Sequence, residues 1–404
     1  MSLTPPSDAV PGHGHSHGPS LESLLATKEI VVFCGSGGVG KTSMAAAAGL
    51  AAASRIGGKV LVVTVDPAKR LADALGIESI GNVERQVPAE AFVRAGLEPR
   101  GELYAAMLDT KQSWDALVLR HAPDEQTALR ILDNRLYENL TARFVQSHDY
   151  VAMERLFEIH QTGTYDLIIV DTPPTRNALD FLDAPKRMAE FFGGRLLRWL
   201  TAPYRVGGRR GARILTAASR PFYQVADRLL GSQFLQDIAE FFLNFQSMYD
   251  GFVARSRSVE ELLHDKRTTF AVVTTLEDAP LREGERFCDE LTKRDFHLGA
   301  LILNKTLPPE LFGPAGARAA AQMRLESAAI ATDVRDGFEP ESVARVLATI
   351  GMSFENFAVV ARREAELRNE LTHRPDVVVD VPTFADEISD VSGLARIARY
   401  LMPS

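Results

Sequence analysis

The chain has 404 residues, 46% hydrophobic and 24% charged, which is an ordinary composition for a soluble globular protein of one large or two smaller domains. Its formal net charge of -8 gives no general basic field, so charge alone does not favour nucleic-acid binding. With only two cysteines, Cys34 and Cys288, far apart in sequence, a disulfide framework is excluded and no cysteine pair offers a zinc site within one chain.

The first segment, residues 1–27, is rich in Pro, Gly, Ser and His, and we expect it to be a disordered tail. Its alternating histidines can chelate a divalent metal, although a solvated tail is the favoured interpretation. The segment lacks the apolar core of a signal peptide, and no uninterrupted apolar run approaches the roughly 18 residues that cross a bilayer. We therefore expect a cytoplasmic protein whose contact with membranes is at most peripheral.

Seven short apolar runs predict buried β-strands, and helical patterns separate most of them. Strands that alternate with helices imply a mostly parallel sheet covered on both faces, so the predicted fold class is α/β. The expected strands cover residues 29–34, 59–65, 102–108, 165–170, 269–275, 298–303 and 377–381.

Two long stretches, residues 111–162 and 185–266, have no strand pattern and carry apolar residues at helical spacing. We interpret both as insertions that pack together into a helical subdomain. The nucleotide-binding domain would then comprise residues 28–110, 163–184 and 267–404.

The first predicted strand runs into a glycine loop that matches the pattern G-x-x-x-x-G-K-[ST] and precedes an Ala-rich helix. In such a loop the glycines let backbone N–H groups surround a phosphate at the positive end of the helix. Lys41 can reach the outer phosphates, and the Thr42 hydroxyl can ligate Mg²⁺. The loop therefore predicts binding of ATP or ADP with Mg²⁺ by Gly35, Ser36, Gly37, Gly38, Val39, Gly40, Lys41, Thr42 and Ser43.

Two aspartates, Asp66 and Asp171, each end an apolar strand and should lie at the carboxyl edge of the sheet, where ligands bind. Asp171 is the candidate Walker-B carboxylate, which holds the water shell of Mg²⁺. Asp66 is the candidate for orienting the attacking water. For both, the alternative role is a helix N-cap.

With these residues in this order, the chain resembles the ArsA-like ATPases, the group that contains arsenical pump-driving ATPases and the ATPases that guide tail-anchored proteins to membranes. It looks like a divergent, bacterial-type member. The resemblance spans nearly the whole folded chain and is carried by residues 35–43, 66–73, 171–179, 301–304 and 381–388.

The resemblance implies two switch segments that reorder with the γ-phosphate, a water-activating role for Asp66 and catalytic use of Lys41. It also implies dimers with nucleotide between the subunits and a helical surface that handles cargo. The implied switch residues are Pro67, Arg70, Asp73, Thr172, Pro174 and Thr175. The implied adenine-side residues are Asn304, Pro382, Thr383 and Phe384, for which plain strand-end and loop roles are the alternatives.

The chain departs from the family at the second loop position, where Ser36 replaces a signature lysine that reaches the opposite subunit's nucleotide. Loss of that cation could remove much of the electrostatic stabilisation of the transition state. Lys69, Arg70 and Arg176 are candidate substitutes, unless they are solvated or salt-bridged. Another option is that a partner subunit supplies the cation, or that hydrolysis is slow.

Two further departures concern the cysteines and the second switch. The family's paired cysteines are absent, so arsenite capture and an intersubunit zinc clamp are not expected. The switch reads Thr175-Arg-Asn177 where Thr-Gly-His is common, so the coupling between subunits could differ.

Residues 189–253 combine Phe and Leu with interleaved arginines. One interpretation is a nucleotide-gated groove for an apolar helix, a lipid tail or a membrane surface. The other is an ordinary helical core with a basic surface.

The leading hypothesis is an ATPase that opens and closes as a homodimer, or a heterodimer with a related subunit, and moves a hydrophobic protein or lipid cargo rather than arsenite. The alternative, which Ser36 favours, is a weakly hydrolytic nucleotide-sensing subunit that regulates a partner. A partition or septum-positioning ATPase is a third option, and the two long helical insertions disfavour it. No nucleic-acid partner is expected.

Overall fold

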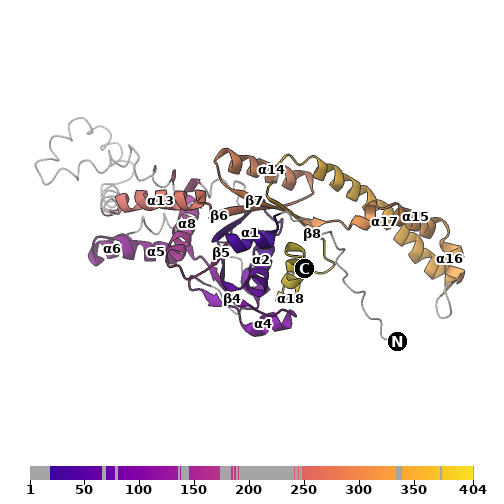
Figure 1. Ribbon diagram of the computed structural model, residues 1–404, viewed down its shortest axis with the longest axis horizontal. Coiled ribbons are helices and arrows are strands. Elements are labelled where there is room, and N and C mark those ends of the chain that lie inside the picture. The colour runs from indigo at the N-terminus through magenta and orange to yellow at the C-terminus, as the bar shows by residue number, and fades with distance from the viewer. Residues whose placement is uncertain are drawn as a thin grey trace, which may run out of the picture.

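A computed structural model of the chain has an eight-stranded sheet at its centre, with helices on both faces and at both ends (Figure 1). The strand order is β3-β4-β2-β5-β1-β6-β7-β8, and every pairing is parallel except that of β3 with β4. The structure describes residues 19–65, 70–77, 81–134, 137, 145–172, 183–184, 186–187, 190, 241, 244, 248–333, 339–373 and 375–403.

All seven predicted strands are confirmed, and the predicted α/β class with them. The sequence analysis missed β3, a two-residue strand at the sheet edge that is too short to show a pattern. The strands are β1 Ile30–Cys34, β2 Gly58–Thr64, β3 Arg85–Gln86, β4 Gly101–Met107, β5 Leu167–Asp171, β6 Thr268–Thr275, β7 Leu298–Thr306 and β8 Val377–Pro382.

The register of the central strands gathers their carboxyl ends at one edge of the sheet. Asp171 of β5 is paired with Phe33 on one side and with Thr64 on the other. Strands β1, β5 and β6 are buried along their whole length, which explains the apolar runs of residues 30–34 in β1 and 167–170 in β5. The polar residues that end these strands therefore meet at a common site.

Each face of the sheet has its own apolar core. On one face, α2 lies across the central strands and α18 packs on α2. On the other face, α8, α13 and α14 contribute to a second core that includes Phe270 and Cys288. The helices of these layers are α1 Leu21–Thr27, α2 Lys41–Arg55, α3 Arg70–Leu75, α4 Ala89–Arg94, α8 Val145–Gln161, α13 Tyr249–His264, α14 Asp278–Lys293 and α18 Val391–Leu401.

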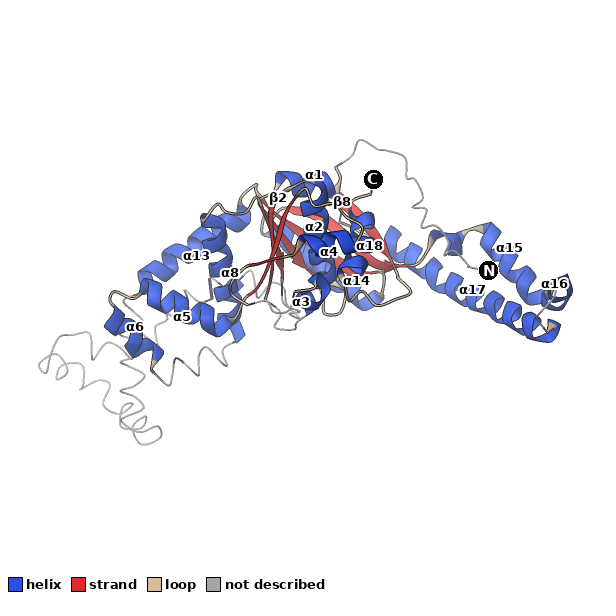
Figure 2. Ribbon diagram, turned by 90° about the horizontal axis from the view of Figure 1, so that it is seen from below, coloured by secondary structure: helices blue, strands red, loops and turns tan. Residues whose placement is uncertain are grey.

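At one end of the sheet, helices α5 (Thr110–His121), α6 (Glu125–Leu132), α8 and α13 form a bundle, which we call the helical end (Figure 2). Helices α5 and α8 come from the first long stretch and α13 from the second, and α13 packs on α8. A third apolar core joins Trp114 and Tyr150 to Phe241 and Met248. Most of the apolar and cationic segment 189–253 lies outside the described residues.

The opposite end of the molecule carries a feature that the sequence analysis did not predict. Residues 267–404 were assigned as a whole to the nucleotide-binding domain, but helices α15, α16 and α17 extend away from the sheet beside β8 (Figures 1 and 2). We call these three helices the helical arm. The elements are α15 Pro314–Leu325, α16 Ser327–Asp333 and α17 Pro340–Asn369, preceded by the 3-10 helix η1 Pro309–Phe312.

The expected disordered tail over residues 1–27 is wrong for its last residues, because Leu21–Thr27 form helix α1. Ser20 and Ser23 cap the helix start reciprocally, each side chain accepting a hydrogen bond from the other's backbone N–H. Leu21, Leu24 and Leu25 recur at helical spacing and are buried in the core that also contains α2. The spacing of these leucines was the overlooked signal.

Leu25→Ala should lower the free energy of unfolding by about 2–4 kcal/mol, because it leaves a cavity under α1. Leu119→Ala makes the same change on a side chain that is 55% exposed and should cost less than about 0.5 kcal/mol. Urea unfolding of both variants measures the difference. Equal costs would contradict the packing of α1 into the core.

Candidate functional site

The glycine loop connects β1 to α2, with Gly40 as the N-cap of the helix. Gly35 has a φ of 148°, and a Cβ atom there would overlap the carbonyl oxygen of Val273 on β6. Gly40 has a φ of 91°, in the left-handed region that favours glycine. Both glycines are therefore required by backbone conformation as well as by close approach of neighbouring strands.

Asn304 at the end of β7 ties the loop to the sheet. Its Nδ2 donates to the carbonyl oxygen of Val39 at 2.8 Å, and a Cβ atom on Gly40 would lie 2.5 Å from the same nitrogen. Asn304 is buried, and its Oδ1 accepts from the backbone N–H of Lys305. In this conformation Asn304, which the resemblance places beside the adenine, holds the loop in position.

Lys41 and Ser36 face each other across the loop. Lys41 is buried, and its Nζ donates to the carbonyl oxygen of Ser36 at 2.8 Å. The Ser36 hydroxyl oxygen is buried with no hydrogen-bond partner among the described residues. Gly37 and Gly38 form the exposed crest of the loop. Ser43 follows in the first turn of α2.

Thr42 and Asp171 join the start of α2 to the end of β5. The Thr42 hydroxyl donates to Asp171 Oδ2 at 2.7 Å, and the hydroxyl of Thr64, the last residue of β2, donates to the same oxygen at 2.9 Å. Asp171 is fully buried. The sequence analysis missed Thr64, although a threonine within the apolar run Val62-Val-Thr-Val65 is a visible signal.

The predicted switch residues are only partly described. Thr172 is held at the end of β1, where its hydroxyl donates to the carbonyl oxygen of Phe33 at 2.9 Å. Asp73 is exposed on α3. The positions that lie outside the described residues are Asp66, Pro67, Lys69, Pro174, Thr175, Arg176 and the side chain of Arg70.

The residues after β8 lie next to the loop's anchor. Thr383 donates its hydroxyl to the carbonyl oxygen of Lys305 at 3.0 Å, and Pro382 pairs with Thr306. The ring of Phe384 packs instead against Tyr400 on α18, with the Arg396 guanidinium 5.3 Å from its centre. Pro382 and Thr383 are thus beside Asn304, whereas Phe384 is held by α18.

Lys305 is a cation at the loop that the sequence analysis did not single out. Its Nζ lies 3.5 Å from the carbonyl oxygen of Gly38, and its side chain is otherwise exposed. It is one of two described non-glycine residues with positive φ, at 58°. Such a conformation persists where the surrounding structure enforces it, so the contact with the loop is a built feature.

The donor set of this site fits a magnesium nucleotide. Thr42 and Asp171 offer hydroxyl and carboxylate oxygens, the ligand type that Mg²⁺ prefers. The buried Ser36 hydroxyl has no hydrogen-bond partner among the described residues, so it is available to a ligand. Lys41 and the helix start supply positive charge toward the loop. A parallel sheet with this loop, this helix and this acidic strand end defines a P-loop NTPase.

Comparison with known proteins gives the narrower identity. The profile of the family described as anion-transporting ATPase matches residues 28–349, and the chain belongs to this family of ATPases. Members of the family bind nucleotide, and the chain is an ATPase by this membership. The match includes the loop, both predicted switches and Asn304.

The individual relatives have low sequence identity to this chain, but the matches cover most of its length. A putative arsenical pump-driving ATPase 1 of Aquifex aeolicus is 25% identical over 70% of this chain and 64% of its own length. The ATPase get3 of Aspergillus terreus is 25% identical over 72% of this chain and 78% of its own. An ATPase ASNA1 homolog 2 of Paramecium tetraurelia is 24% identical over 72% of this chain and 81% of its own length.

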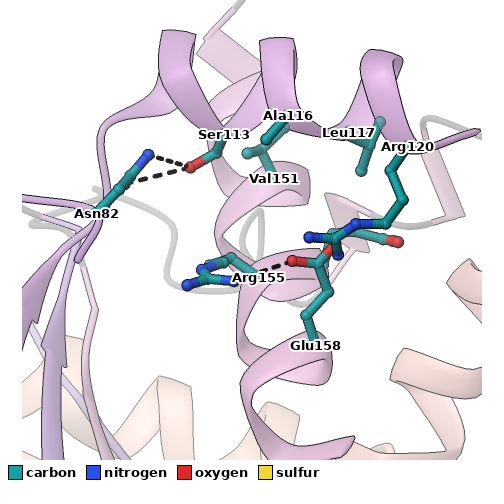
Figure 3. Close-up of a pocket in the computed structure, with 9 residues that line it drawn as sticks. Asn82, Ser113, Ala116, Leu117, Arg120, Val151, Arg155 and Glu158 are labelled. Atoms are coloured by element: carbon teal, nitrogen blue, oxygen red, sulfur yellow. Dashed lines mark hydrogen bonds and ion pairs between the residues drawn. The ribbon is translucent and has the colours of Figure 1, made fainter. Parts of the chain in front are cut away.

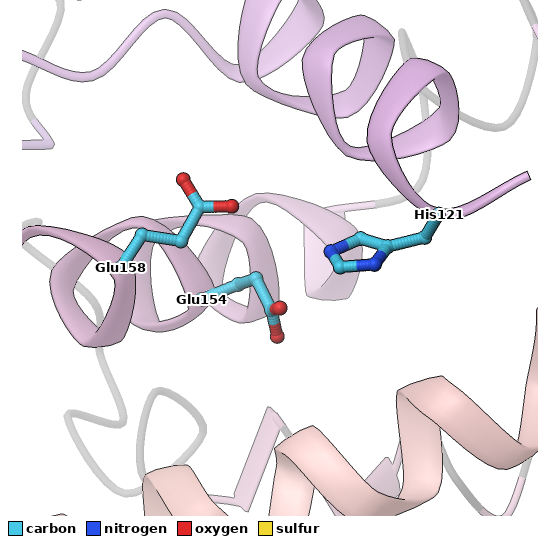
Figure 4. A group of neighbouring side chains, drawn as sticks. All are labelled: His121, Glu154 and Glu158. Carbon is cyan, nitrogen blue, oxygen red and sulfur yellow. The ribbon is translucent and has the colours of Figure 1, made fainter. Parts of the chain in front are cut away.

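A second polar cluster lies in the helical end, beside a pocket of about 160 Å³ between α5 and α8 (Figure 3). His121, Glu154 and Glu158 have ligand atoms within 4.8 Å of one another, a metal-like grouping (Figure 4). Arginines already neutralise the carboxylates: Arg255 pairs with Glu154, and Arg120 and Arg155 pair with Glu158. Three arginines around two carboxylates disfavour a metal cation, so we interpret the cluster as an ion-pair network.

Within this network the carboxylate of Glu154 is 1% exposed, and its burial raises its pKa despite the opposing effect of Arg255. Arg255→Leu should destabilise the fold by about 3–5 kcal/mol, because it leaves that carboxylate buried without its cation. Because the pKa of Glu154 is raised in the folded state, ionisation of this carboxyl destabilises the fold as pH rises. The loss of stability in Arg255→Leu should therefore become smaller as pH falls toward 5. Adding Glu154→Gln should restore most of the loss.

Urea unfolding of the single and double variants at pH 7.5 and pH 5 measures these effects, with Arg257→Leu on the same helix as control. A pH-independent defect, or one that Glu154→Gln does not reduce, would contradict the assignment. Tight binding of a divalent metal to the cluster would contradict it as well.

Proposed function

We propose that the chain is a Mg²⁺-dependent ATPase that closes as a dimer around ATP and so controls a hydrophobic or membrane-related cargo. The observation that carries the proposal is the hydrogen bond between Thr42 and Asp171 directly beside the phosphate loop. It joins the two groups that a P-loop site uses around its metal, and it is held by a second hydroxyl from Thr64.

In this proposal the loop backbone from Gly35 to Ser43 holds the phosphates, and Lys41 turns from the Ser36 carbonyl to the outer phosphates. Thr42 would bind Mg²⁺ directly, and Asp171 would hold the ion through its water shell. The metal, when bound, neutralises charge that develops between the outer phosphates. Asp66 is proposed to orient the attacking water, by the resemblance described above.

At the nucleoside end, Asn304, Pro382 and Thr383 are proposed to contact the base. Their support is that Asn304 is bonded to the loop at Val39, while Thr383 is bonded to Lys305 and Pro382 pairs with Thr306, the residues that follow Asn304. The switch role proposed for Thr172 is supported by its bond to Phe33, which couples the end of β5 to the end of β1. Phe384 has less support, because α18 already holds its ring.

The proposed cargo is not arsenite. Cys34 and Cys288 are each 1% exposed, and burial raises the pKa of Cys34 well above the ordinary thiol value and that of Cys288 to about 12. Arsenite binds thiolates, and these thiols are protonated at neutral pH and out of reach. We also propose a cytoplasmic location, as expected from the sequence, and a hydrophobic protein or lipid cargo, which the family resemblance implies.

The second candidate is a weakly hydrolytic sensor subunit that binds nucleotide and regulates a partner. Ser36 in place of the signature lysine favours it, because the transition state would lack that cation. Turnover by the purified chain separates the two candidates.

We expect the purified chain to hydrolyse ATP only with Mg²⁺, and Lys41→Ala and Asp171→Asn to lower kcat roughly 100-fold or more, since each removes charge at the phosphates or metal. Light scattering should show a larger mean mass with a non-hydrolysable ATP analogue than with ADP, because the proposed closure needs the γ-phosphate. Lys293→Ala, an exposed lysine on α14, is the matched control.

Turnover that survives Lys41→Ala would contradict the proposed site. Nucleotide binding without turnover or dimer formation by the chain alone would instead support the sensor subunit, with the missing cation supplied in trans.

Lys305→Ala should weaken ADP binding about tenfold, because a cation beside the loop crest is lost and the loop loses a contact at Gly38. Lys305→Arg should retain part of the affinity. Lys59→Ala, at the start of β2 and 49% exposed, should leave binding unchanged. Titration calorimetry of the three variants makes the comparison, and equal affinities would exclude Lys305 from the site.

A further inference from the structure

Helix α17 exposes more large apolar side chains than any other described element. Seven such residues lie on the helical arm, and six of them are on α17 itself. Its most apolar 18-residue window has a mean hydropathy of 1.4 and is only 11% buried, so by length and composition α17 meets the test for a membrane-spanning helix. The exposed residues are Leu325, Val346, Ile350, Met352, Phe357, Val359 and Val360.

The side of α17 that faces the molecule is already occupied. Helices α15 and α16 pack along its first half, with Ala320, Gly351 and Ala358 buried between them. Its second half is fixed to the body, where Arg363 pairs with Asp278 and Arg368 with Asp380. The apolar residues listed above are between 48% and 71% exposed, so these contacts leave much of their surface uncovered.

Apolar residues of α17, four of them exposed and Val343 half-buried, follow a heptad pattern. Val343, Ile350 and Phe357 occupy one core position, and Val346, Ser353 and Val360 the other, with alternating spacings of three and four residues. Such a seam of 18 residues extends about 27 Å, the length of a short coiled coil. Val346, Ile350, Phe357 and Val360 are each about half exposed, so these four positions of the seam are open to solvent among the described residues.

We propose that this seam pairs with the same seam of a second copy of the chain, the two α17 helices running antiparallel. An antiparallel pair places Val343 against Val360, Val346 against Phe357, and Ile350 against Ser353 of the second copy. Every layer is apolar apart from the two that contain Ser353, and the two-fold axis makes the surface self-complementary.

Charge selects the antiparallel orientation. In it, the flanking residues Thr349 and Arg363 face Asn356 and Ser342 of the second copy, so no like charges meet. A parallel pair would bring Glu364 near Glu364 and Arg363 near Arg368 of the second copy, in addition to the partners that each has in its own chain. Both contacts are repulsive.

Charge also disfavours a membrane as the occupant. Helices α15, α16 and α17 contain six arginines, five acidic residues and no lysine. Surfaces that lie on anionic lipid carry a basic excess on the polar face, which the helical arm lacks. A mixed charge pattern around an apolar seam is typical of helix pairing between proteins.

The test uses the full chain without nucleotide, so that it is independent of the ATPase proposal. Analytical ultracentrifugation should show a self-association that persists in Lys41→Ala. The double variant Ile350→Glu with Phe357→Glu should raise its dissociation constant roughly 30-fold or more. Val93→Glu, 70% exposed on α4, is the control for an added surface charge. Circular dichroism checks that each variant is folded.

Cross-linking fixes the orientation. A short bismaleimide linker should join a Val343→Cys chain to a Val360→Cys chain, and should not join Val343→Cys chains to one another. The native Cys34 and Cys288 are buried and should not react. A monomer that is unchanged by the glutamate variants would overturn the proposal, as would cross-linking of Val343→Cys to itself. Flotation of the chain with anionic vesicles that the glutamates abolish would instead assign the seam to a membrane.

Discussion

The hydrogen bond between Thr42 and Asp171 determines the arrangement of the site. It requires the first turn of α2 and the last residue of β5 to meet, and the parallel register of β1, β2 and β5 brings them together. Asp171 is fully buried, and burying a carboxylate without donors is costly. The two hydroxyls from Thr42 and Thr64 therefore stabilise the sheet edge and at the same time prepare oxygen ligands for a metal.

The loop is also held by strands β7 and β8, which lie on the opposite flank of β1 from β5 and β2. Asn304 and Lys305 bring the end of β7 against Val39 and Gly38, and Thr383 from the end of β8 is bonded to Lys305. Strands far apart in the sequence thus converge on one loop. A change in the bound nucleotide that moves the loop would also displace the ends of β7 and β8. Strand β8 carries Asp380, the residue with which Arg368 of the helical arm forms an ion pair.

The sequence predicted the sheet and the loop well, because buried parallel strands and glycine loops are encoded locally. Helix α1 was missed because a Ser- and Pro-rich start masked three leucines at helical spacing. The helical arm was missed because its helices are amphipathic like those of the core, and only the three-dimensional placement shows which apolar face remains exposed. Lys305 could not be recognised, because only the folded chain, where its φ is positive, places its Nζ beside the carbonyl oxygen of Gly38. The roles of Asp66 and the switch residues remain predictions.

The central claim, that Thr42 and Asp171 form a metal site for bound nucleotide, is tested most directly by titration calorimetry of ADP with and without Mg²⁺. The wild-type chain should bind ADP at least about tenfold more tightly with Mg²⁺, and Thr42→Val, which keeps the side-chain volume, should lose that gain while binding metal-free ADP unchanged. An equal Mg²⁺ gain in wild type and variant, or none in either, would contradict the claim.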